Sequence, residues 1–185
     1  MRNDRKEFEI LAPAGSREAM AAAAAAGADA VYFGLGALDM RSLATGAFGE
    51  ADLPDIAAFA KDHNLKTRLT VNAVLYDEDL AAARQTMLAA KKAGIDAVIC
   101  SDVAAMMLAH EVGIPVHLST QLNIANVEAL KFYARFADVA VLARELTLEQ
   151  TAAITRAIDE QNICGPSGKR IKIEIFCHGA LCIAQ

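Results

Sequence analysis

The stretch GADAVYFG at residues 27–34 recurs in altered form as GIDAVICS at 94–101 and as ADVAVLAR at 137–144. In each copy a helical, alanine-rich segment ends, a turn residue follows, and a run of apolar and β-branched residues begins. Strands that alternate with helices form right-handed βαβ units, whose strands lie parallel in one sheet. The repeat therefore predicts an α/β fold.

The same pattern continues along the chain and predicts seven strands and six helices. We expect the strands at 7–12, 30–35, 66–73, 96–101, 115–121, 138–144 and 171–177, and the helices at 16–26, 52–63, 77–93, 102–112, 126–136 and 147–161. A (β/α)8 barrel has eight strands, so we predict one TIM-barrel-like domain over residues 1–185 that is incomplete after its seventh strand. A doubly wound open sheet is the alternative, but the first turn, APAGSRE, lacks the glycine-rich phosphate loop of that fold.

Composition narrows the class of protein. Hydrophobic residues make up 55% of the chain and charged residues 22%, as in globular domains. We find no apolar run that would span a bilayer, and the polar start MRNDRKEFEI is no secretory signal. We therefore expect a cytoplasmic protein whose four cysteines form no structural disulfides. The net charge of −5 argues against a nucleic acid held by bulk positive charge.

Several predicted strands carry polar residues on one of their two sides. Side chains alternate along a strand, so Arg68, Thr70 and Asn72 share a side that should face the barrel interior. Chemistry in barrels takes place at the carboxyl ends of the strands. We predict a polar pocket there, with a structural hydrogen-bond network as the alternative. Its predicted lining is Glu9, Tyr32, Arg68, Asn72, Gln121, Asn123, Arg144, Glu145, Glu174 and His178.

Two arginines indicate an anionic ligand. Arg41 lies in the segment 36–51, which is longer than an ordinary βα loop, and Arg144 ends the sixth predicted strand. A guanidinium group matches a carboxylate or a phosphate with two parallel hydrogen bonds. A surface ion pair is the alternative for each of them.

Common hydrolase motifs do not occur. His110 and His117 are separated by seven residues and Pro115, so they do not form the H-E-x-x-H zinc motif. Neither G-x-S-x-G nor S-x-x-K is found. Cys177 and His178 are adjacent and would point to opposite sides of a strand. The spacing of Cys177 and Cys182 in CHGALC is a weak metal signal.

Six stretches together resemble, in order and spacing, the collagenase-like peptidase family, which is peptidase family U32. They are EILAPAGSREAM, GADAVYFGLG, MRSLATGAF, STQLNIAN, VLARELTLEQ and IEIFCHGALC. The family hallmark is similar to E-x-F-x-H-G-x-x-C followed by four residues and G-x-C. Its first half is matched by Glu174, Phe176, His178, Gly179 and Cys182. The resemblance therefore implies the N-terminal barrel portion of a longer protein.

The resemblance implies two kinds of activity. The family name implies a peptidase, whereas other members are oxygen-independent hydroxylases of tRNA bases, rRNA bases or ubiquinone precursors. Those members use prephenate and a [4Fe-4S] cluster, for which Cys182 would be the first ligand. This chain keeps that one matched cysteine, so the cluster is expected in the intact protein rather than in this fragment.

We expect the hydroxylase activity, because arginines near a polar barrel mouth suit a dicarboxylate such as prephenate. Peptide hydrolysis and a non-enzymatic, dimerising scaffold are the alternatives. We assign catalytic roles to Glu174, His178, Asn72 and Gln121, and substrate binding to Arg41, Arg68, Asn123, Arg144 and Glu145.

Overall fold

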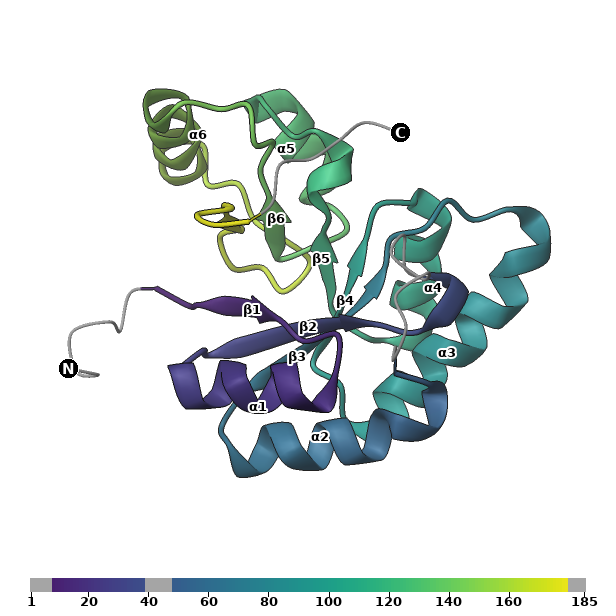
Figure 1. Cartoon of the computed structure of the whole chain (residues 1–185). Helices are drawn as coiled ribbons and strands as arrows, with labels where there is room; N and C mark the ends of the chain where they lie inside the picture. Colours follow the sequence, from purple (N-terminus) through teal and green to yellow (C-terminus); the bar gives the residue numbers. More distant parts are fainter. Residues whose placement is uncertain (1–7, 39–47, 180–185) are drawn as a thin grey trace. The chain divides into compact units, whose positions relative to one another are not determined.

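The computed structural model describes residues 8–38 and 48–179 (Figure 1). The chain divides into two compact units, Met1–Val116 (unit 1) and His117–Gln185 (unit 2). Two predicted site residues, Arg41 and Cys182, lie outside the described residues. The prediction of a single domain stays a prediction.

Unit 1 consists of parallel strands and helices that alternate along the chain (Figure 1). Its strands pair in chain order, β1 with β2, β2 with β3 and β3 with β4. They are β1 (Leu11–Pro13), β2 (Ala30–Gly34), β3 (Lys66–Val71) and β4 (Ala97–Cys100). The helices are α1 (Arg17–Ala26), α2 (Leu53–Asp62), α3 (Leu80–Ala93) and α4 (Val103–Val112), with short 3-10 turns η1 (Gly36–Leu38), η2 (Glu50–Asp52) and η3 (Asp77–Asp79).

Unit 2 continues the same alternation. Strand β5 (Val116–Leu118), which begins at the last residue of unit 1, is followed by the turn η4 (Thr120–Leu122), α5 (Val127–Tyr133), β6 (Val139–Val141), α6 (Leu148–Glu160) and β7 (Lys172–Glu174). The pairs β5–β6 and β6–β7 are parallel. Among the described residues, no helix is both apolar and long enough to cross a membrane.

Local sequence signals fix the helix ends. The side chain of Ser16 accepts a hydrogen bond from the backbone N–H of Ala19 at 3.2 Å and so begins α1. Gly27, Gly94 and Gly113 end α1, α3 and α4 with φ angles of 86°, 91° and 74°. Only glycine adopts this left-handed conformation without a steric cost, which explains why the helices end there.

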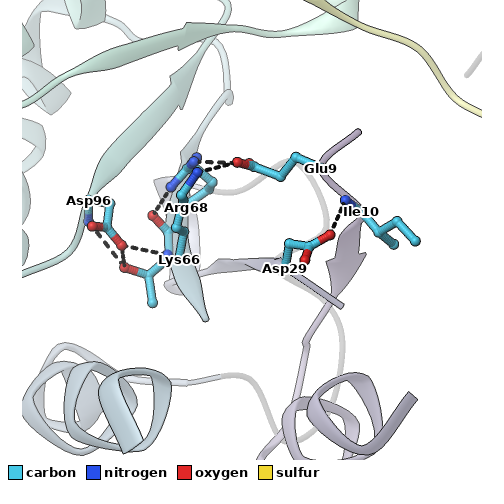
Figure 2. Close-up of polar contacts among 7 residues, drawn as sticks. Glu9, Ile10, Asp29, Lys66, Arg68 and Asp96 are labelled. Atoms are coloured by element: carbon cyan, nitrogen blue, oxygen red, sulfur yellow. Dashed lines mark hydrogen bonds and ion pairs between the residues drawn. The ribbon is translucent and has the colours of Figure 1, made fainter. Parts of the chain in front are cut away.

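The aspartate of the repeated stretch ties neighbouring strands of unit 1 together. Asp96 Oδ2, just before β4, accepts hydrogen bonds from the backbone N–H and the hydroxyl of Thr67 in β3, at 2.7 and 2.9 Å. Asp29 Oδ2, just before β2, accepts one from the backbone N–H of Ile10, just before β1, at 2.8 Å (Figure 2). A carboxylate acceptor makes such bonds stronger than neutral ones. The repeat therefore encodes strand register as well as strand position.

In unit 2 an aspartate before β6 accepts similar hydrogen bonds. Asp138 Oδ1 accepts hydrogen bonds from the backbone N–H and the hydroxyl of Ser167, at 3.2 and 2.7 Å. The loop 162–170 fits closely against this carboxylate, since a Cβ atom on Gly165 would lie 2.3 Å from Asp138 Oδ1 and 2.6 Å from the Ala137 carbonyl oxygen. A larger residue than glycine would therefore displace the loop that leads into β7.

The predicted strands and helices are confirmed in kind and order within the described residues, but β5, β6 and β7 each end three residues earlier than predicted. Strand β5 stops at Leu118, and the chain then turns through η4 to Asn123, whose φ is 49°. Strand β7 stops at Glu174. Alternation along a strand therefore does not place Gln121, Asn123 or His178, and that part of the prediction was wrong.

The aspartate bonds can be tested by mutation. We expect Asp96→Ala to lower the free energy of unfolding by about 1–3 kcal/mol, because two donors at the start of β3 lose a charged acceptor. Urea unfolding followed by far-ultraviolet circular dichroism measures the change. Asp62→Ala is the matched control, since this exposed aspartate ends α2 and has no hydrogen bond or ion pair among the described residues. Equal losses in the two variants would contradict the role of Asp96.

Candidate functional site

The two sides of β3 face different surroundings. Thr67 lines, together with Leu65, a groove of about 790 Å³ along α2 and α3, so this side of the strand faces the helices. Arg68 and Thr70 lie on the other side, and their exposed fractions are only 5% and 6%. The polar side predicted for this strand is therefore buried away from the helices.

Arg68 is a buried cation that is held by a carboxylate from another strand. Its Nη2 donates a hydrogen bond to Glu9 Oε1 at 3.2 Å, and its Nη1 donates to the Thr67 carbonyl oxygen at 3.1 Å. Lys66 forms an ion pair with the other carboxylate oxygen of Glu9 (Figure 2). The Nε of Arg68 is buried and has no hydrogen-bond partner among the described residues. One carboxylate thus balances two cations.

This ion-pair cluster lies at the amino-terminal ends of the strands. Lys66 is the first residue of β3, and the strand register places it level with Leu11 of β1, two residues after Glu9. Barrel chemistry is found at the opposite, carboxyl ends. Glu9 and Arg68 were predicted to line a pocket at the carboxyl ends, but the contact between them points the guanidinium the other way. For these two residues the alternative of a structural network applies.

The carboxyl ends of β3 and β4 are joined by a hydrogen bond from a side chain to the backbone. Asn72 directly follows β3 and is half-buried, and its carbonyl oxygen accepts a hydrogen bond from the Ser101 hydroxyl at 3.0 Å. Its backbone N–H donates to the Leu38 carbonyl oxygen at 3.2 Å. Tyr32, in β2, is half-buried and level with Arg68. Asn72 is therefore the predicted site residue that unit 1 places at its carboxyl edge.

Hydrogen bonds draw together the carboxyl ends of the three strands in unit 2. The backbone N–H of Leu142 donates to the Glu174 carbonyl oxygen at 3.0 Å, which joins β6 to β7. The Thr120 hydroxyl donates to the Leu142 carbonyl oxygen at 3.3 Å, and the Ala143 N–H donates to the Ile124 carbonyl oxygen at 2.9 Å. These bonds hold the segments that follow β5 and β6 against each other.

Most of the predicted site residues lie on this edge of unit 2. Glu174 ends β7 and is half-buried, while the segments beyond the strands carry Gln121, Asn123, Arg144, Glu145 and His178. The Gln121 side-chain oxygen accepts a hydrogen bond from the Ser119 hydroxyl at 3.0 Å. Arg144, Glu145 and His178 are exposed. The edge therefore combines amides, carboxylates, an imidazole and a guanidinium.

Phe176 belongs to this edge, although our assignment of roles did not include it. The guanidinium carbon of Arg144 lies 5.9 Å from the centre of the Phe176 ring. This distance is within the range of a cation–π interaction. The sequence signal was the place of Phe176 in the family hallmark, two residues after Glu174.

The predicted pocket draws on residues from both units. Asn72 belongs to unit 1, whereas Gln121 and Glu174 belong to unit 2. The prediction that they line one shared pocket stays a prediction.

The described cysteines lie in three different places. Cys100 is buried in β4, and burial together with the charge of Asp102 raises the pKa of its thiol to about 12. The Cys164 thiol, before β7, contacts the Asn162 carbonyl oxygen at 3.3 Å, and Cys177 is exposed beyond the other end of β7. Among the described residues, no group of three or more His, Cys, Asp or Glu could hold a metal ion. These cysteines do not by themselves fit a [4Fe-4S] cluster.

Parallel strands that alternate with helices, with polar residues at the carboxyl ends, define a protein of the TIM-barrel class. A solved U32 peptidase structure matches the fold with a TM-score of 0.68 and 18% identity, over 91% of this chain and 67% of that chain. The fold is thus that of an incomplete (β/α)8 barrel, as predicted. The profile of peptidase family U32 matches residues 15–185, and the chain belongs to this family.

Curated relatives carry two kinds of name. A collagenase of Porphyromonas gingivalis is 56% identical over 178 residues, which are 96% of this chain and 43% of the relative. A 23S rRNA 5-hydroxycytidine synthase of Escherichia coli is 35% identical over 96% of this chain and 25% of the relative. The tRNA hydroxylation protein P of the same organism is 33% identical over 95% and 37%. The chain spans less than half of the length of each of these relatives.

The ion pair of Glu9 with Arg68 predicts that replacing the carboxylate destabilises the protein more than replacing the guanidinium. Glu9→Ala leaves the buried Arg68 guanidinium without its carboxylate, so we expect a loss of about 1–3 kcal/mol in the free energy of unfolding. Arg68→Met replaces the cation by an apolar side chain, while the part-exposed Glu9 keeps Lys66 as a partner. We therefore expect a smaller loss from Arg68→Met, measured by urea unfolding. A larger loss from Arg68→Met would contradict this account.

The raised pKa of Cys100 predicts a protected thiol. At neutral pH in the folded protein we expect iodoacetamide to alkylate Cys100 at least about a hundredfold more slowly than the exposed Cys177, because the thiolate is the reactive form. Peptide mapping by mass spectrometry measures both sites, and unfolding in urea should remove the difference. Rapid native labelling of Cys100 would show that it is accessible.

Proposed function

We propose that the intact protein is a cytoplasmic, oxygen-independent hydroxylase, and that this chain supplies its carboxylate-binding barrel portion. The proposed substrate is a base of tRNA or rRNA, with a quinone precursor as the second substrate class. The observation that carries the proposal is Arg144, an exposed guanidinium at the carboxyl ends of β6 and β7. The names of the rRNA and tRNA hydroxylation relatives support the type of reaction.

The surroundings of Arg144 favour a carboxylate ligand. No carboxylate of the described residues forms an ion pair with it, although Glu145 is next to it in the sequence. A guanidinium binds a carboxylate through two parallel N–H donors, and neutral amides such as Gln121 and Asn123 add donors without adding charge. A dicarboxylate fits this chemistry, with Arg144 binding one carboxylate. Prephenate is the dicarboxylate that the family resemblance implies.

The roles of the remaining residues follow from their chemistry. Glu174 and His178 can accept or donate a proton, so we assign to them the proton transfers of the reaction. A [4Fe-4S] cluster, which Cys182 would help to hold in the intact protein, supplies electron-transfer chemistry when it is bound. The described cysteines do not complete such a site, so the proposal assigns no step of the reaction to them.

Peptide hydrolysis is the second candidate, because the relative with 56% identity is named a collagenase. In this case Glu174 and His178 would act on a peptide bond, with Arg144 binding a substrate carboxylate. Cys100 is excluded as a nucleophile, since its pKa of about 12 keeps the buried thiol protonated at neutral pH.

The two candidates differ in their product. The full-length protein, purified without oxygen and analysed for iron and sulfide, is incubated with prephenate and RNA from cells that lack the gene. We expect nucleoside mass spectrometry to find a base with one added oxygen atom, and Arg144→Ala to reduce its yield at least about tenfold through loss of a charged contact. Glu149→Ala, which removes an exposed charge on α6, is the control for surface changes.

A parallel incubation with gelatin and with a quinone precursor separates the alternatives. Gelatin cleavage that Glu174→Ala or His178→Ala abolishes, without any hydroxylated base, would replace the hydroxylase by a peptidase. A hydroxylated quinone precursor with unmodified RNA would keep the reaction and change the substrate class.

A further inference from the structure

The Phe176 ring contacts the Arg144 guanidinium, and none of the roles assigned above explains this contact. We propose that Phe176 is a positioning residue, whose ring holds the Arg144 guanidinium in the orientation in which it binds a carboxylate. The inference deepens the proposed function and rests on the carboxylate site described there.

Strand pairing places the two residues side by side. The β6–β7 register pairs Val141 with Glu174, and the Leu142 N–H donates to the Glu174 carbonyl oxygen at 3.0 Å. Arg144 follows three residues after Val141, and Phe176 two residues after Glu174. The guanidinium carbon lies 5.9 Å from the ring centre. The two residues therefore belong to the short segments that directly follow a pair of hydrogen-bonded strands.

The Phe176 ring is only partly buried. Phe176 is 48% exposed, nearly the same as the neighbouring Ile175 at 49%. A half-exposed phenylalanine gives up part of the free energy that full burial would provide. The ring is therefore not part of the buried core, and its contact with Arg144 is the interaction that the proposal uses.

A cation–π contact has a particular advantage for an arginine that must bind a ligand. The ring attracts the guanidinium through its π face and takes none of its N–H donors. The donors at the edge of the guanidinium remain available for a carboxylate. Holding a long side chain in one orientation before the ligand arrives lowers the entropic cost of binding. Carboxylates such as Glu145 would hold the arginine equally well but would occupy those same donors.

The test measures prephenate affinity in the full-length protein by isothermal titration calorimetry. Phe176→Leu keeps an apolar side chain and removes the π face, and we expect it to raise the dissociation constant about two- to fivefold. Phe176→Tyr keeps the ring and should restore an affinity close to that of the unchanged protein. Ile175→Ala is the matched control, because it alters an equally exposed residue of the same segment and should leave the affinity unchanged.

A double-mutant cycle separates positioning from direct contact with the ligand. If Phe176 acts through the arginine, Phe176→Leu should have no further effect on affinity in the Arg144→Ala background. An undiminished effect in that background would overturn the inference, and so would equal affinities of Phe176→Leu and the unchanged protein. Unchanged protein that binds no prephenate would instead contradict the proposed function.

A second measurement needs no ligand. The Nε–Hε resonance of Arg144, assigned by its loss in Arg144→Lys, should carry a ring-current shift that Phe176→Leu removes and Phe176→Tyr retains. A resonance that does not change in Phe176→Leu would show that the stack is absent in solution and would overturn the inference. Circular dichroism spectra that match the unchanged protein would confirm that each variant is folded.

Discussion

The carboxylate that precedes a strand and binds its neighbour is the interaction on which the rest of this structure depends. Asp29, Asp96 and Asp138 occupy one place in the repeated unit, and each accepts a hydrogen bond from the amino-terminal side of an adjacent strand or of the loop leading into it. Parallel strands connected through helices have no tight turn to set their register. A charged acceptor at the start of each copy of the repeated stretch helps to set that register locally. The sides to which the strand residues point follow from that register, because a slip by one residue would turn each side chain to the other face.

The arginines at the two ends of the strands differ in burial and in the groups that they contact. Arg68 is buried at the amino-terminal end, where Glu9 compensates its charge, as the low dielectric of a protein interior requires. Arg144 is exposed at the carboxyl end and contacts an aromatic ring instead of a carboxylate. In the first arrangement the guanidinium donates hydrogen bonds to the protein itself, so it stabilises the fold and has few donors left for a ligand. The second leaves the donors available. The location of the nearest carboxylate, rather than the residue type, therefore distinguishes the two arginines and makes Arg144 the better candidate for binding a ligand.

The sequence predicted the features that local interactions determine. Ser16 and Gly27 mark the ends of α1 because caps and left-handed turns depend on a few adjacent residues. Alternation gave the correct side for Arg68 but not the end of the strand toward which its long side chain extends, because that depends on Glu9, 59 positions away. The alternation of side chains along a strand did not place Gln121 and Asn123, because the turn η4 begins before these residues. The contact between Arg144 and Phe176 arises only when β6 and β7 pair, so no single segment contains a signal for it.

The residues at the carboxyl edge of unit 2 differ in what they can do chemically, and this divides the predicted catalytic set. Gln121 is a neutral amide whose oxygen already accepts a hydrogen bond from Ser119, so it can orient a ligand but cannot transfer a proton at ordinary pH. Glu174 and His178 are the titratable groups of the family hallmark on this edge, and both come from the end of β7. The pairing of β6 with β7 positions Glu174, whereas His178 lies four residues beyond the last residue of β7. Arg144 and Phe176 follow the same two strands, with the guanidinium carbon 5.9 Å from the ring centre. Under the proposed function, substrate orientation and proton transfer would both draw on residues at the ends of β6 and β7.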